Sequence, residues 1–124
     1  MSIDKKRLGK AGEDRAARFL AKQGFRIIER NHRAPYGEID LIALDRGELV
    51  FVEVKTRTSD AFGSPELSVN PRKQQRMIKA ALAYIKHKRL HQMPCRFDVV
   101  AISHATEKEI EHIRNAFAMD RKGM

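Results

Sequence analysis

The sequence lacks the features that mark secreted and membrane proteins. It has a single cysteine, Cys95, so no disulfide can form within the chain. The N-terminal stretch MSIDKKRLGK is charged and no apolar segment follows it, unlike a secretory signal. The longest uncharged apolar runs, such as AALAYI, are too short to cross a bilayer. These absences predict a cytoplasmic protein with no membrane partner.

Acidic residues are absent from one long stretch, between Leu67 and Phe97. The basic residues of the same stretch are Arg72, Lys73, Arg76, Lys79, Lys86, Lys88, Arg89 and Arg96. A solvated helix face normally mixes both signs, so this pattern favours a phosphate-binding surface. A basic face that only aids solubility is the alternative. Over the whole chain, 25 Lys and Arg against 16 Asp and Glu give a formal charge of +9, which also favours a polyanionic partner.

Aromatic residues are few, with no tryptophan, two tyrosines and six phenylalanines, and few of them lie among the basic residues. Stacking on the bases of a single strand is therefore poorly supported. Recognition of the backbone and shape of duplex or branched DNA fits the composition better. RNA is an alternative partner, because charge does not distinguish the two nucleic acids.

The length of 124 residues, with 42% hydrophobic and 33% charged residues, predicts one soluble domain over 1–124 whose last residues, about 118–124, form a flexible tail. Apolar residues at three- and four-residue spacing predict a helix over 4–23, and a second that Asn70 caps and Pro71 opens. The predicted strands are 25–28, 38–44, 48–55, 96–102 and, at a sheet edge, 109–117. A turn is expected over 31–37 and a loop over 56–70. This order indicates an α/β protein with a mixed sheet flanked by helices.

Residues 37–55, GEIDLIALDRGELVFVEVK, alternate as a half-buried β-hairpin requires. A two-residue loop at 46–47 pairs Asp45 with Glu48, and this register sets Asp40 opposite Glu53. A four-residue loop keeps the same register, whereas a three-residue loop breaks it. The hairpin therefore brings two carboxylates together at the end far from its turn.

Charge repulsion between Asp40 and Glu53 has to be offset. Opposed residues have Cβ atoms roughly 5 Å apart, and two ionised carboxylates at that distance repel by about 3 kcal/mol at an effective dielectric near 20. Lys55, which this register sets opposite Glu38, can offset part of this repulsion. A raised carboxylate pKa or a divalent cation can offset the remaining repulsion. Carboxylate and water oxygens are the ligands that Mg²⁺ or Mn²⁺ prefers. Weak surface salt bridges at a frayed hairpin end are the alternative.

The same residues carry a family resemblance. Asp40, followed after a hairpin by Glu53-Val54-Lys55, resembles the D…(D/E)xK signature of restriction-endonuclease-like nucleases. The stretches GEDRAARFLAKQGF, RNHRAPYGEIDLIA, FVEVKTR and RFDVV, in this order and spacing, resemble the small bacterial YraN-type family over about residues 8–117. That family is described as related to archaeal Holliday-junction resolvases. The resemblance implies a restriction-endonuclease-like α-β-α sandwich with a phosphodiesterase site.

The resemblance also assigns roles to individual residues. Asp40 and Glu53 match the metal-binding carboxylates, Lys55 matches the catalytic lysine, and Glu13 matches a helix acid that could complete the metal shell. The carbonyl of Val54 is a further candidate ligand, because it lies between the two motif side chains. The basic residues expected to contact phosphates are Arg33, Arg57, Arg72, Lys73, Arg76 and Lys79.

The sequence thus predicts a Mg²⁺- or Mn²⁺-dependent DNA endonuclease, acting on duplex or branched DNA. The alternative is a non-catalytic module that binds DNA or RNA with the same fold. A resolvase that cuts two strands would have to act as a symmetric homodimer.

Overall fold

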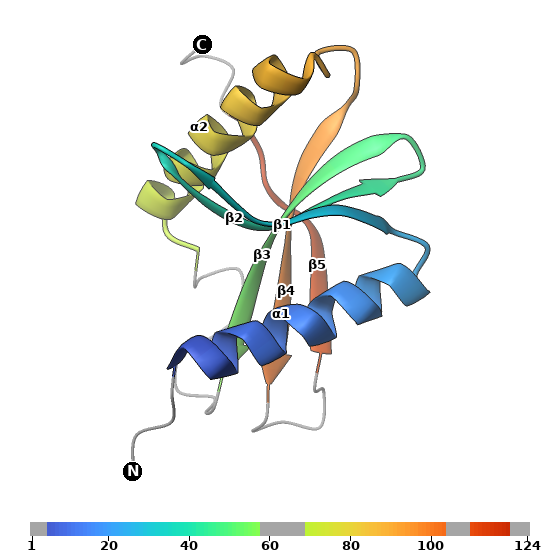
Figure 1. The fold of residues 1–124 in the computed structure, drawn as a ribbon, viewed down its shortest axis with the longest axis vertical. Coiled ribbons are helices and arrows are strands. Elements are labelled where there is room, and N and C mark those ends of the chain that lie inside the picture. The colour runs from blue at the N-terminus through green and yellow to red at the C-terminus, as the bar shows by residue number, and fades with distance from the viewer. Residues whose placement is uncertain (1–4, 58–68, 104–109, 120–124) are drawn as a thin grey trace.

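The described part of the chain, residues 5–57, 69–103 and 110–119 of the computed structural model, forms two helices and five strands (Figure 1). In chain order these are α1 (Lys5–Lys22), β1 (Arg26–Ala34), β2 (Gly37–Asp45), β3 (Glu48–Arg57), α2 (Pro71–Lys88), β4 (Cys95–Ser103) and β5 (Ile110–Phe117). Most of the loop expected over 56–70, and most of the tail expected over 118–124, lie outside the described residues. No helix in the described ranges is long and apolar enough to cross a membrane.

The strands form one sheet in the order β1-β2-β3-β4-β5. β3 and β4 are parallel, and the other neighbouring pairs are antiparallel. α2 lies in the connection between the two parallel strands, as such a crossover requires. The prediction of a mixed α/β sheet is confirmed, and so is the position of β5 at its edge.

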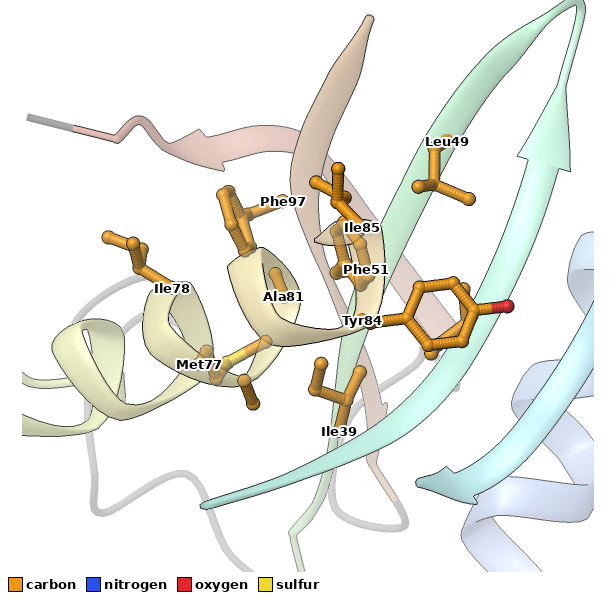
Figure 2. Close-up of a cluster of buried hydrophobic side chains, with 11 residues drawn as sticks. Ile39, Leu49, Phe51, Met77, Ile78, Ala81, Tyr84, Ile85 and Phe97 are labelled. Carbon is orange, nitrogen blue, oxygen red and sulfur yellow. The ribbon is translucent and has the colours of Figure 1, made fainter. Parts of the chain in front are cut away.

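The two helices cover opposite faces of the sheet, because alternate strand residues point to opposite sides. On one face, α2 packs against β2, β3 and β4 through Met77, Ala81 and Tyr84 (Figure 2). The other face is covered by α1. The fully buried strand residues under α2 include Ile42, Leu49 and Phe51, whereas those under α1 include Leu41, Ala43, Val50 and Val52. Ile39 also lies under α2 although it is only two residues from Leu41, so the alternation of β2 is interrupted between these two residues. The central strands are thus apolar on both faces, which requires a helix on each.

α2 begins where the sequence predicts. The side chain of Asn70 accepts a hydrogen bond from the backbone N–H of Lys73 at 2.9 Å, and Pro71 takes the first helical position. Pro71 has no N–H to leave unpaired there. This start fixes which side chains the first turn of α2 directs toward the sheet.

The β2–β3 hairpin closes with the predicted two-residue loop. Asp45 pairs with Glu48, and both loop residues have positive φ, 52° at Arg46 and 82° at Gly47. That backbone suits the twist of a tight hairpin. The ladder continues to the pair formed by residues 41 and 52 and ends there. Asp40 and Glu53 are therefore the first residues beyond it, and the pairing of Glu38 with Lys55 lies outside the ladder.

The turn predicted over 31–37 is wrong for residues 31–34, which belong to β1, and for Gly37, which begins β2. β1 continues to Ala34, which pairs with Gly37, so only Pro35 and Tyr36 form the turn. A register shift between residues 27 and 29 and a positive φ of 52° at Asn31 allow this irregular strand to follow β2. The polar residues that look like a loop in the sequence are partly exposed strand residues.

Candidate active site

Asp40 and Glu53 lie on neighbouring strands at the point where β2 and β3 separate. Glu53 is buried, with 4% of its surface exposed, and Asp40 is partly buried. Oδ2 of Asp40 accepts a hydrogen bond of 2.8 Å from the backbone N–H of Val54. The carboxylate thus bonds across the two strands just beyond their ladder. This bond fixes the orientation of Asp40 relative to the E-V-K stretch.

The Asp40 carboxyl group is strongly perturbed. Burial raises its pKa first and the charge of Glu53 raises it further, while the bond from Val54 lowers it; the resulting pKa is about 8, against an ordinary 3.8. The charge of Glu13 adds to the rise and that of Lys73 opposes it. Near neutral pH the pair therefore holds a proton that an ordinary carboxylate would have released.

Two lysines share Glu53. Nζ of Lys55, on β3, lies 3.5 Å from Oε1 of Glu53, and Nζ of Lys73, in the first turn of α2, forms an ion pair with the same oxygen. Burial and the neighbouring Lys73 lower the pKa of Lys55, although Glu53 opposes this. Burial also disfavours the charge of Lys73, but the attraction of Glu53 outweighs it and raises the Lys73 pKa. Lys73 is thus the more firmly charged of the two.

A pocket of about 390 Å³ contains this cluster. β2 and β3 contribute Glu38, Asp40 and Glu53 to its lining, and the start of α2 contributes basic residues. The basic lining residues are Arg72, Lys73 and Arg76. The N-terminus of α2 adds the positive end of the helix dipole to these charges, and no acidic residue in the first turn of the helix offsets it. The pocket therefore combines buried carboxylates with a cationic wall.

Glu13 lies at the margin of the site. Its side chain hydrogen-bonds that of Asn31 on β1, and burial raises its pKa despite this bond. Its charge reaches Asp40, but no group of three or more His, Cys, Asp or Glu within the described residues is gathered closely enough to hold a metal. The roles of Glu13 and of the Val54 carbonyl as metal ligands stay predictions.

Close packing positions the helix that carries Glu13. A Cβ added at Gly12 would overlap Oγ1 of Thr56 on β3. α1 therefore lies so close to β3 here that any side chain at residue 12 would force Thr56 or the helix to shift. The approach brings the helix over the strand that carries Glu53.

The predicted phosphate contacts divide into two groups. Arg72, Lys73 and Arg76 line the pocket, and Arg33 lines a second, adjoining one with Arg76. Lys79 is exposed on α2 but lines neither pocket, and the side chain of Arg57 lies outside the described residues. The ion pair between Lys73 and Glu53 is what the sequence did not predict, because helix docking leaves no local signal.

A second charged cluster, which the sequence did not predict either, lies where β4 begins. Arg96 donates to Asp45 at 2.9 Å, to Glu48 at 2.7 Å and to Asp98 at 3.0 Å. Asp98 is fully buried and also bonds His112 on β5 at 2.8 Å. Burial alone would raise the Asp98 pKa, but the bonds from His112 and Arg96 hold it below the ordinary value. This cluster ties the hairpin turn to β4 and β5.

Comparison with known protein families identifies the family of this chain. The model of the uncharacterised protein family UPF0102 matches residues 12–102. The chain belongs to this family. A UPF0102 protein of Trichlorobacter lovleyi is 52% identical over 113 residues, which covers 89% of each chain. One of Thermodesulfovibrio yellowstonii is 53% identical over 110 residues, covering 89% of this chain and 95% of the relative.

The UPF0102 match spans the whole candidate site, from Glu13 to Arg76. Among solved structures, SfsA of Pyrococcus furiosus in complex with Ca²⁺ aligns with a TM-score of 0.37 and 15% identity. That alignment covers 94% of this chain and 66% of the other.

Proposed function

We propose that this UPF0102 protein is a metal-dependent endonuclease that hydrolyses phosphodiester bonds in DNA, with a restriction-endonuclease-like fold and site. The observation that carries the proposal is the pair of Asp40 and Glu53, which lines one pocket together with basic residues of α2. A sheet with one helix on each face supports the fold assignment, as does a D…ExK stretch at the point where two strands separate.

The carboxylate pair fits a divalent cation. The pKa of Asp40 is raised first by burial and then by the charge of Glu53, and a cation bound between the two carboxylates would favour the ionised form of both. Asp40 and Glu53 would supply two oxygens, and water or phosphate oxygens would complete the shell of Mg²⁺ or Mn²⁺. The bound ion would polarise the phosphoryl group and lower the pKa of a bound water.

The chain's own side chains would orient the reaction. Lys55 lies beside Glu53, where its ammonium group can hold the attacking water or stabilise developing negative charge on the phosphate. The lowered pKa of Lys55 makes release of a proton easier than from an ordinary lysine. The guanidinium groups of Arg72 and Arg76 would hold the flanking phosphates.

One observation favours a non-catalytic alternative. Lys55 and Lys73 already bring two positive charges to Glu53, so the pocket can balance its two carboxylates without a metal. In that case the protein would bind a nucleic-acid backbone through the basic wall and cut nothing. Competition between matched RNA and DNA duplexes would then identify the preferred partner.

The deciding experiment is a cleavage panel on linear, flapped and branched DNA with Mg²⁺ or Mn²⁺. We expect wild type to nick at least one substrate, and Asp40→Asn and Lys55→Met to lose the activity while still binding. Asp14→Asn, which removes an exposed carboxylate paired with Arg30, is the matched control and should cleave normally. Salt-sensitive binding with no product at any metal concentration would establish the non-catalytic alternative instead. Coordinated cutting of two strands would further require a homodimer, which light scattering would detect.

A further inference from the structure

Tyr36 is an exposed aromatic side chain beside the candidate active site. Its surface is 57% exposed, more than that of Ile28 (37%) or Leu82 (36%), the other large hydrophobic residues that are exposed in the described ranges. Among the residues that the structure describes, none stacks on its ring or forms a hydrogen bond with it. An unpartnered ring at a hairpin tip provides a flat apolar face that is open to a ligand.

The hairpin tip is held in a fixed position. Pro35 and Tyr36 form a two-residue turn, closed by the pairing of Ala34 with Gly37. A Cβ at Gly37 would lie 3.2 Å from Cβ of Arg76 and 3.4 Å from its carbonyl oxygen, so α2 packs closely against the base of the tip. This contact holds the base of the tip against α2.

A pocket of about 470 Å³ lies at the tip, and its lining includes Tyr36 and two cationic residues, Arg33 on β1 and Arg76 on α2. Gly37, Glu38 and Arg76 line both this pocket and the one that contains the carboxylates. The two pockets are therefore adjacent parts of one surface. A phosphate chain that leaves the carboxylates along Arg76 would reach Tyr36 next.

We propose that the pocket at the tip of the β1–β2 turn binds an unpaired nucleotide of DNA, with its base stacked on Tyr36 and its phosphates held by Arg33 and Arg76. An aromatic side chain combined with cationic side chains in one groove is a common arrangement for binding single-stranded nucleic acid. A paired base inside a duplex cannot offer its face to the ring. The subsite would thus select DNA with a flap or gap beside the cut.

The position of the unpaired nucleotide follows from the strand geometry. Asp40 is four positions after Tyr36 along the chain, and at about 3.3 Å per position in a strand this is roughly 13 Å. Stacked nucleotides repeat about every 3.4 Å along a strand, so the base on Tyr36 lies at most about four nucleotides from the bond to be cut. In an extended single strand each nucleotide spans a longer distance, so fewer nucleotides would separate this base from the bond to be cut.

The subsite rests on the proposed DNA substrate but not on catalysis, so its test measures binding in EDTA. Anisotropy would compare labelled duplex with the same duplex bearing a short single-stranded flap. 2-Aminopurine at successive flap positions would report stacking. We expect wild type to bind the flap about tenfold more tightly than the duplex, and to quench 2-aminopurine at one or two positions.

Tyr36→Ala should remove both the flap preference and the quenching while leaving duplex binding unchanged. Tyr36→Phe should retain both, because it keeps the ring. Leu82→Ala, another exposed apolar residue, is the matched control and should match wild type, and urea unfolding would show that each variant is folded. The subsite would be overturned if Tyr36→Ala lost flap and duplex binding equally, or if it bound both as wild type does. It would also be overturned if the wild-type protein bound no DNA. Tyr36-dependent flap binding without cleavage under any metal condition would refute the nuclease and leave the subsite standing.

Discussion

Replacing Asp40 by Asn should stabilise the metal-free protein, although the same change should abolish cleavage. Asn keeps a side-chain carbonyl that can accept the hydrogen bond from Val54, and it removes the charge that opposes Glu53. The folded-state pKa of Asp40 lies above its unfolded value. The folded protein therefore binds a proton that the unfolded chain releases, and stability falls as the pH rises between these two values.

The magnitude follows from two routes. The pKa of Asp40 is about 8 in the folded protein against an ordinary 3.8, and this difference corresponds to at most about 6 kcal/mol. Burial is the largest cause of this difference, and repulsion by Glu53 is the second, worth about 3 kcal/mol for two carboxylates roughly 5 Å apart at an effective dielectric near 20. We therefore expect Asp40→Asn to raise the free energy of unfolding by about 3 kcal/mol or more above pH 8, and by progressively less toward pH 4.

Urea denaturation followed by far-UV circular dichroism would measure this gain at a series of pH values between about 5 and 9. Asp14→Asn is the matched control: an ion pair with Arg30 lowers the Asp14 pKa, so its removal should bring no gain at any pH. Addition of Mn²⁺ should stabilise wild type more than Asp40→Asn. An Asp40→Asn protein that is no more stable than wild type at high pH would refute the reasoning that the two carboxylates repel each other.

Three further predictions concern packing, the buried charges and Lys73. Gly12→Ala should lower the free energy of unfolding by about 1–2 kcal/mol in urea melts, because its Cβ would overlap a β3 side chain. Gly9→Ala, with open space around its Cβ, should instead raise the free energy of unfolding by up to about 1 kcal/mol. Equal changes in stability for the two variants would contradict the close contact between Gly12 and β3. Asp98→Asn should destabilise the protein by about 3 kcal/mol near neutral pH, with the difference narrowing in acid, whereas a neutral effect in the same melts would show that the second cluster is dispensable. Lys73→Met should bind Mn²⁺ at least about fivefold more tightly in calorimetry, because Glu53 loses a competing cation, and should bind DNA less tightly; unchanged Mn²⁺ affinity would separate Lys73 from the metal site.

The parts of the fold that the sequence predicted are those with local signals. Alternating apolar residues identified β2 and β3, and the Arg46-Gly47 loop set their register. Asn70 and Pro71 identified the start of α2. β1 was predicted too short, because its polar residues and its irregular register resemble a turn when read without the partner strand.

The site was predicted as far as one hairpin could specify it. The predicted hairpin register holds from the turn to the pair formed by residues 41 and 52, and it places Asp40 and Glu53 one residue beyond its end. The ion pair of Lys73 with Glu53 depends on how α2 docks on the sheet, and so does the pocket that Tyr36 lines together with Arg76 of α2. Such contacts join residues that are distant in the chain, so no spacing rule reveals them.

The central claim is that Asp40 and Glu53 jointly bind a divalent cation. Anomalous diffraction from crystals soaked in Mn²⁺ would test it most directly. We predict a peak between the two carboxylates, with Lys73 displaced from Glu53. Crystals without a peak there, in which Lys55 and Lys73 still contact Glu53, would contradict the claim.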